Sequence, residues 1–421
     1  MTAEFQYMMH LAGCAALGSA PNPPPEGIDW AQVLVFANEQ TVLPLVQYAM
    51  KQASFEIPEE HRKKAAASLN GLAVQGVVRR MGVLRVLEEL ERQGITAVVI
   101  KGFAIAQDYA QPDVRISSDA DIYIREEDEA RALEIFKGFG FTYKEREPSH
   151  KDTTLLHPRF GMVELHIRLF EEFIHDIWYE KKGFQILEPY QKAESPDGSY
   201  FVFGDTDHFL YVLEHMMKHF IMDGLSLRMM LDVGVLLQKR GQNMDWARVE
   251  QFLTQRRYRE ALRVFRWILG RYCGFSFPNQ KLEVTEEPLS AAALLEEMEC
   301  GGVLGFKIGD SNSQNDGMRI YNSELMKEQK SWMTSWKSNN RNLFCLLAPP
   351  MAIMKEKYPC LRKAPILYPL MILHRLVVKG GYHVGKRDLE LKNWQFSVEE
   401  SKLKPSSGTR RAELFRQLDM M

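Results

Sequence analysis

The chain has 421 residues, of which 45% are hydrophobic and 26% are charged, and its formal net charge is −2 at pH 7. This balance is typical of a folded protein with more than one domain and excludes fibrous and disordered classes. The near neutrality also excludes a globally basic surface that would hold long nucleic acid, although a few local cations suffice for a single nucleotide.

The cysteines and the apolar segments point to a compartment. The five cysteines form no CxxC pair, which favours a reducing environment over a disulfide framework or a thiolate zinc site. The apolar stretch 8–20 follows Glu4 and lacks a basic leader, so we expect mature protein there. The run 364–373 is interrupted by prolines and too short to cross a bilayer. We therefore expect a cytoplasmic protein without membrane insertion.

The first half of the chain changes from a helical to a strand-like pattern. Apolar residues recur at three- and four-residue steps over 60–93, which predicts a long amphipathic helix. The β-branched run 95–100 follows and predicts a buried strand. Lys101 and Gly102 stand at its end and open a short helix predicted over 103–109.

Two later segments alternate as half-buried strands do. Around Asp119 and Asp121, the two carboxylates face one way and the apolar residues face the other. In the segment 162–169, the same alternation puts Glu164 and His166 on one face. Further elements complete a small sheet: a helix predicted over 126–137 and strands over 141–144 and 153–156.

Beyond Phe201 the helical period returns, and helices are predicted over 207–220, 225–239, 246–255 and 258–272. We expect an α+β fold, with a small mixed-sheet core flanked by N-terminal and C-terminal helical regions. The predicted divisions are an N-terminal helical region 1–94, an α/β core 95–200, a helical domain 201–300, and a C-terminal loop and helical region 301–421.

The spacing of Asp119 and Asp121 carries the chemical prediction. Alternate strand residues lie roughly 6.6 Å apart, so the two carboxylates can converge on divalent cations. Two cations about 3.5 to 4 Å apart can hold both oxygens of an in-line phosphoryl displacement. Glu164 reaches the same position if its strand is the neighbour. Three such carboxylates repel one another, so we expect at least one raised pKa and no loss of stability in Asp121→Asn.

Upstream residues provide candidates for anion binding. Lys101 and Gly102 begin a short helix, where backbone N–H groups favour phosphate and glycine allows close approach. Arg115 can place a bidentate fork on a second phosphate. His166 either orients a carboxylate or touches the nucleotide, and the pattern leaves both roles open.

Together these residues resemble the DNA polymerase β superfamily of nucleotidyltransferases, and more closely a family described as uncharacterised nucleotidyltransferases. In that family a strand, a Lys-Gly pair, an Arg, a D-x-D and a V-E-L-H strand follow in this order. Here they stand as Val98-Val-Ile-Lys-Gly102, Arg115, Asp119-Ala-Asp121 and Val163-Glu-Leu-His166. The superfamily usually has Gly-Ser at its phosphate loop, whereas Phe103 follows Gly102 here.

The resemblance implies a metal-dependent enzyme that uses Mg²⁺ or Mn²⁺. It would move a nucleoside monophosphate from an NTP to a hydroxyl of a small molecule or protein. Asp119, Asp121 and Glu164 would be the catalytic and metal-binding residues, with Glu164 helping to deprotonate the acceptor. Nucleotide binding is assigned to Lys101, Gly102, Arg115, Ser117, Ser118 and His166.

Other interpretations of the same residues remain. A D-x-D strand also holds sugar nucleotides in metal-dependent glycosyltransferases, although the Lys-Gly loop and the V-E-L-H strand argue against that class. A nucleotide-binding regulator without turnover is a further alternative, favoured by the missing serine after Gly102. His215 and His219 lie one helical turn apart, and with Asp232 they resemble a zinc site. We favour packing or substrate contact as neutral bases for the two histidines, because no further ligand is suitably spaced.

Overall fold

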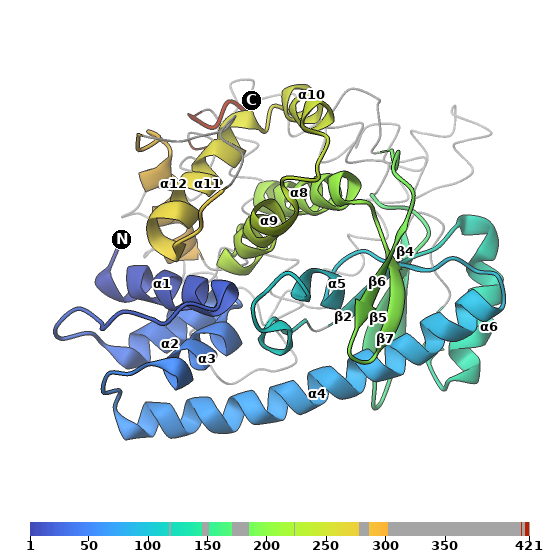
Figure 1. Cartoon of the computed structure of the whole chain (residues 1–421), viewed down its shortest axis with the longest axis horizontal. Helices are drawn as coiled ribbons and strands as arrows, with labels where there is room; N and C mark the ends of the chain where they lie inside the picture. The colour runs from blue at the N-terminus through green and yellow to red at the C-terminus, as the bar shows by residue number, and fades with distance from the viewer. Residues whose placement is uncertain are drawn as a thin grey trace, which may run out of the picture. The chain divides into compact units, whose positions relative to one another are not determined.

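The chain begins with helices, continues into a mixed sheet and returns to helices (Figure 1). The structure is a computed structural model that describes residues 1–117, 119–144, 151–170, 185–222, 224–277, 286–301, 414 and 417–420. The chain divides into two compact units, and the first consists of residues 1–170, 183–309 and 418–420. All elements considered below belong to this first unit. The predicted region 301–421 lies almost wholly outside the described residues.

Helices form the N-terminal part, as the sequence pattern predicts. Their bounds are α1 Ala3–Leu17, α2 Trp30–Glu39, α3 Leu43–Gln52 and α4 Glu59–Arg92. The α4 helix matches the long amphipathic segment, and its C-terminal half contributes Val83, Leu84, Val86, Leu87 and Leu90 to the core beside the sheet. None of the described helices combines the length and the apolar character needed to cross a membrane.

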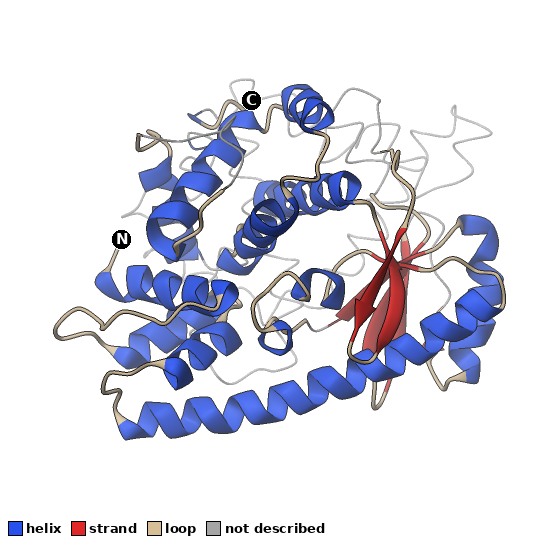
Figure 2. Ribbon diagram, in the orientation of Figure 1, coloured by secondary structure: helices blue, strands red, loops and turns tan. Residues whose placement is uncertain are grey.

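The central elements alternate between strands and short helices (Figure 2). Their bounds are β1 Val98–Val99, α5 Phe103–Ala106, η1 Pro112–Val114, β2 Asp119–Tyr123, η2 Glu126–Asp128, α6 Glu129–Gly138, β3 Thr142–Tyr143, β4 Asp152–His157, β5 Gly161–His166, β6 Gln191–Ser195 and β7 Gly198–Val202. Among the described residues these strands form one seven-stranded sheet in the order β3-β4-β5-β2-β1-β7-β6. The β1 strand pairs antiparallel with β2 and parallel with β7, and β2 pairs parallel with β5, so the sheet is mixed.

The C-terminal helices of the first unit are α8 Asp205–Met222, α9 Leu227–Arg240, α10 Trp246–Arg256, α11 Arg259–Cys273 and α12 Ala291–Gly301. Side-chain caps determine where two of them begin. Ser226 accepts a hydrogen bond from the Met229 N–H at the start of α9, and Asp245 accepts from Ala247 and Arg248 at the start of α10. Such caps satisfy N–H groups that have no partner within the helix.

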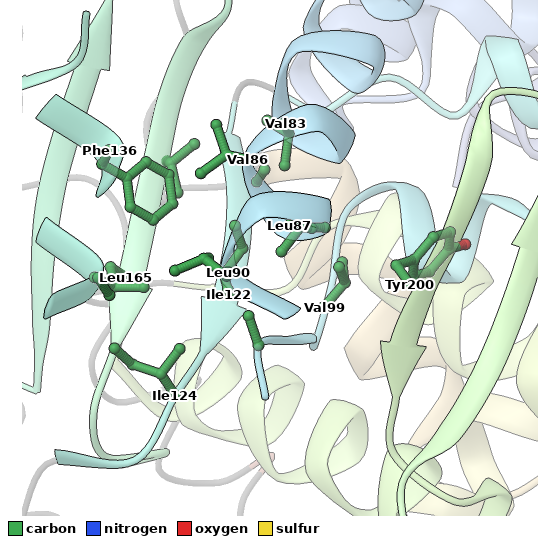
Figure 3. Packing of buried hydrophobic residues seen from close by; sticks show 14 of the residues in the cluster. Val83, Val86, Leu87, Leu90, Val99, Ile122, Ile124, Phe136, Leu165 and Tyr200 are labelled. Atoms are coloured by element: carbon green, nitrogen blue, oxygen red, sulfur yellow. The ribbon is translucent and has the colours of Figure 1, made fainter. Parts of the chain in front are cut away.

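One face of the sheet forms the hydrophobic core of the α/β part (Figure 3). Ile122 and Leu165 point from β2 and β5 toward Leu87 and Leu90 of α4 and Phe136 of α6, and all five are at most 4% exposed. Because alternate strand residues face opposite ways, burial of the apolar set places the polar set on the other face. The predicted mixed α/β fold is confirmed, and the core fixes which sheet face carries the carboxylates.

The hairpin of β6 and β7 was not among the predicted elements. It adds β7 beside β1, with Val98 opposite Phe201. The turn between the two strands contains Pro196-Asp197-Gly198, and proline, aspartate and glycine in this order are typical of a tight turn. That signal would have identified the hairpin.

Candidate functional site

The β2 and β5 strands lie side by side and run parallel, with Asp121 directly opposite Glu164. The two strands are therefore neighbours, which is the condition under which Glu164 was expected to reach the position of Asp121. Strands in a sheet are about 4.8 Å apart, so the two carboxylates extend from neighbouring backbone positions on the same face. A sequence separation of more than forty residues thus becomes direct proximity in space.

Asp121, Glu164 and His166 form a cluster of potential metal ligands. One ligand atom from each lies within 4.8 Å of the other two. The His166 Nε2 atom is 3.1 Å from Asp121 Oδ1 and 3.6 Å from Glu164 Oε2. The side chain of Glu164 is 28% exposed, whereas those of Asp121 and His166 are almost completely buried. Glu164 therefore gives this cluster its access to solvent.

Lys151 determines which nitrogen of the His166 ring accepts a hydrogen bond. The Lys151 Nζ atom is 3.2 Å from His166 Nδ1. An ammonium group only donates hydrogen bonds, so Nδ1 accepts and the ring proton sits on Nε2, which donates to Asp121. Both ring nitrogens are thus occupied and the residue is buried. His166 therefore orients Asp121, which is one of the two roles that the sequence left open.

Lys101 supplies the main counter-charge of the cluster, with its Nζ atom 2.7 Å from Asp121 Oδ1. Burial raises the pKa of Asp121, but the Lys101 charge and the His166 hydrogen bond outweigh it and hold the pKa well below its usual range. The direction of this pKa shift is opposite to the one that repulsion among the three carboxylates would cause. The physical reason is that the groups nearest to the Asp121 carboxylate, Lys101 and His166, donate hydrogen bonds to it.

Asp119 lies two residues earlier on the same strand face, but it stands outside the cluster. Its partner on β5 is Met162, so no acid lies opposite it. The Asp119 carboxylate accepts a hydrogen bond of 2.8 Å from Ser117 Oγ, and Arg79 donates to the Ser117 carbonyl. Ser117 thus positions Asp119 in this structure. The predicted contribution of Ser118 lies outside the described residues.

Gly102 holds the Lys101 segment against the start of β2. Its φ of 66° lies in the region that side chains rarely adopt, and a Cβ atom added there would be 3.3 Å from the Asp119 carbonyl oxygen. The helix after it, α5, has four residues where the sequence pattern predicted seven. Glycine is therefore required by backbone conformation and close approach, while the helix that follows is too short for a large dipole.

Arg115 directs its fork at Asp232 of α9. Arg115 Nε and Nη2 donate to the two carboxylate oxygens at 3.0 and 2.6 Å, and Tyr109 donates to the same carboxylate at 2.8 Å. Arg115 is 5% exposed, and its Nη1 atom is buried without a hydrogen-bond partner. The guanidinium group that was predicted to bind phosphate thus joins the segment before β2 to α9.

The α8 helix approaches the cluster through its histidines. His215 Nε2 lies 3.3 Å from Lys101 Nζ and 3.1 Å from His219 Nε2. Because Asp232 is held by Arg115 and Tyr109, it does not join these histidines. Within the described part of the chain, the group of three potential metal ligands consists of Asp121, Glu164 and His166. His215 and His219 thus lie in polar contact with Lys101 and with each other.

A family model described as "Uncharacterised nucleotidyltransferase" matches residues 26–274, which is more than half of the chain. The chain belongs to this nucleotidyltransferase family. Comparisons with curated proteins and with solved structures found no match. The matched segment contains the whole sheet and the helices α8–α11, and therefore every residue of the cluster and of the contacts around it.

Sequence reasoning missed Lys151 and did not assign the contacts that Asp232 and His215 make around the site. Lys151 precedes β4, Asp232 lies on α9, and His215 contacts Lys101 from α8. Only for the last two was there a signal, because both were noted as candidate zinc ligands. Long-range contacts of this kind have no local periodicity, so their partners emerge only when the strands and helices are assembled.

Proposed function

We propose that this chain transfers a nucleoside monophosphate from an NTP to a hydroxyl on a small molecule or protein, with the help of Mg²⁺ or Mn²⁺. The observation that supports this is the direct pairing of Asp121 with Glu164 on adjacent parallel strands, beside the Lys101 ammonium. The polymerase β-like type of nucleotidyltransferase is part of the proposal. In such an active site, the carboxylates of Asp121 and Glu164 would bind metal ions, and the nearby Lys101 ammonium would bind phosphate.

The donor set fits a hard divalent cation. Mg²⁺ prefers oxygen ligands and is usually bound by one or two carboxylates together with substrate phosphates. Asp121 and Glu164 provide such carboxylates, and Asp119 is a third on the same strand face. The cation, when bound, would offset the negative charge of the triphosphate and polarise it. His166 would remain an orienting residue, since its Nε2 proton is donated to Asp121.

The chain's own residues would divide the remaining work. The acceptor oxygen bonds to the α-phosphorus while the bond from that phosphorus to the pyrophosphate oxygen breaks, and pyrophosphate leaves. Glu164, as the more exposed carboxylate, would accept the proton of the acceptor hydroxyl. Lys101 would neutralise an oxygen of the triphosphate once it no longer pairs with Asp121. We also propose that the unpartnered Nη1 of Arg115 faces the bound nucleotide.

Glu164→Gln tests this proposal because it removes a carboxylate that lies partly at the surface. We expect purified wild-type protein to bind NTP in the presence of Mg²⁺ in isothermal titration and to release pyrophosphate. The Gln variant should fold normally and lose at least about a hundredfold in pyrophosphate release, the usual scale for a general base. Glu194→Gln, at an exposed glutamate on β6 of the same sheet, is the matched control. Nucleotide binding without pyrophosphate release by the wild type would instead support the regulator, and a requirement for a sugar nucleotide would support the glycosyltransferase.

A further inference from the structure

The Lys101 ammonium lies between two acceptors that come from different parts of the fold. Its Nζ atom is 2.7 Å from Asp121 Oδ1 on β2 and 3.3 Å from His215 Nε2 on α8. The Lys101 side chain is 16% exposed, so solvent satisfies little of its charge. The two protein acceptors therefore matter for keeping this ammonium charged and in place.

Hydrogen-bond chemistry fixes the role of His215. An ammonium group donates and never accepts, so His215 Nε2 must carry its lone pair toward Lys101. The Nε2 atom of the nearby His219 lies 3.1 Å from the same His215 atom. Burial and the surrounding cations, first among them Lys101, hold the pKa of His215 well below its usual value. His215 is therefore a neutral acceptor.

The position of His215 is set by contacts along one face of α8. His208, two helical turns earlier, lies 3.3 Å from the Ile100 carbonyl oxygen through its Nε2. Arg240 lies 3.2 Å from the other ring nitrogen of His208 and so donates to it. The Tyr211 ring stacks near that of His215, with centroids 6.2 Å apart. Residues seven apart share a helix face, so His208 and His215 lie on the same side of α8. His208 attaches this side to Ile100 at the end of β1, and His215 contacts Lys101 from it.

We propose that His215 is a positioning residue that holds Lys101 when a divalent cation takes the Asp121 carboxylate. The inference rests on the proposed metal site, and it adds a residue of α8 to the partners of Lys101. A cation and an ammonium compete for the same carboxylate and repel each other. With His215 in place, the displaced ammonium keeps one strong acceptor. Without it, cation binding leaves a largely buried ammonium unpaired.

The proposal predicts opposite effects from two substitutions on Mn²⁺ affinity, measured by electron paramagnetic resonance of the full chain without nucleotide. His215→Phe keeps the ring but has no acceptor, and we expect about tenfold weaker binding, the scale of one charge-assisted hydrogen bond. His215→Gln offers an amide oxygen and should bind Mn²⁺ as the wild type does. Lys101→Met removes the competitor and should bind it more tightly.

The double variant Lys101→Met with His215→Phe separates positioning from a merely structural role. Because His215 acts through Lys101, the Phe substitution should leave Mn²⁺ affinity unchanged in the Met background. An equal loss in both backgrounds, or wild-type affinity in His215→Phe, would overturn the inference. If His215→Phe does not fold, His215→Leu provides the same comparison.

Two further outcomes distinguish the inference from the proposed function. If the wild type binds no Mn²⁺, both the metal site and the role of His215 are refuted. If Mn²⁺ binding follows the pattern above but the protein releases no pyrophosphate, the role of His215 stands and the proposed nucleotidyl transfer fails.

Discussion

Asp121→Asn changes a charge at the centre of the site while keeping its shape. Asp121 is 2% exposed, and its Oδ1 atom accepts from Lys101 and His166. Removing one partner of a fully buried ion pair usually costs about 3 to 5 kcal/mol of stability. Lys101 is partly exposed and keeps His215 as an acceptor, so we expect a smaller loss of about 1 to 3 kcal/mol. This replaces the expectation from sequence that the variant loses no stability, because Asp121 pairs with Lys101 and His166 in the structure.

The same substitution should have a defined pH dependence. The pKa of Asp121 is lower in the folded protein than in the unfolded chain, because Lys101 and His166 stabilise the charged form more than burial opposes it. The carboxylate therefore contributes stability that is fully present above its unfolded pKa of about 3.9 and is lost as pH falls toward the folded pKa. The gap between wild type and variant should be constant at neutral pH and narrow below about pH 4.

Thermal unfolding of both proteins at several pH values measures this gap. We expect a melting temperature lower by on the order of a few degrees at pH 7 in the Asn variant. Glu164→Gln is the control, since that carboxylate is more exposed and its ion-pair contact with His166 is longer, at 3.6 Å. An equal or higher melting temperature for Asp121→Asn would show that repulsion among the acids, and not pairing with Lys101, dominates at this position.

Two other substitutions test the scaffold of the site. Arg115→Lys keeps the charge but loses the bidentate contact with Asp232, so unfolding experiments should show a loss of about 1 to 3 kcal/mol, and an unchanged melting temperature would contradict the buried pair. Gly102→Ala should cost about 1 to 2 kcal/mol, because φ is 66° and the new Cβ lies 3.3 Å from the Asp119 carbonyl oxygen. Mn²⁺ binding should weaken with it, and full retention of stability and binding would show that this backbone tolerates a side chain.

The sequence predicted the elements of the site better than its contacts. Alternation around Asp121 and Glu164 reveals which residues share a face, because a buried strand face requires apolar side chains at every second position. The pairing of these strands depended on a register that no local pattern contains. The partners of Arg115 and Lys101 come from α9 and α8, more than a hundred residues later in the chain. A phosphate-binding fork and a buried ion pair also look identical in sequence, since both need only an arginine.

Pyrophosphate release from an NTP labelled at the γ-phosphate tests the central claim most directly. Purified protein would be incubated with the labelled NTP, Mg²⁺ and a cell extract as the source of hydroxyl acceptors, beside the Glu164→Gln variant. Nucleotidyl transfer breaks the bond at the α-phosphorus, so we predict that the label leaves as pyrophosphate and that the variant releases little. Two results would contradict the account. One is equal release of label by the wild type and the variant. The other is recovery of the label as inorganic phosphate when added unlabelled pyrophosphate has excluded pyrophosphatase activity.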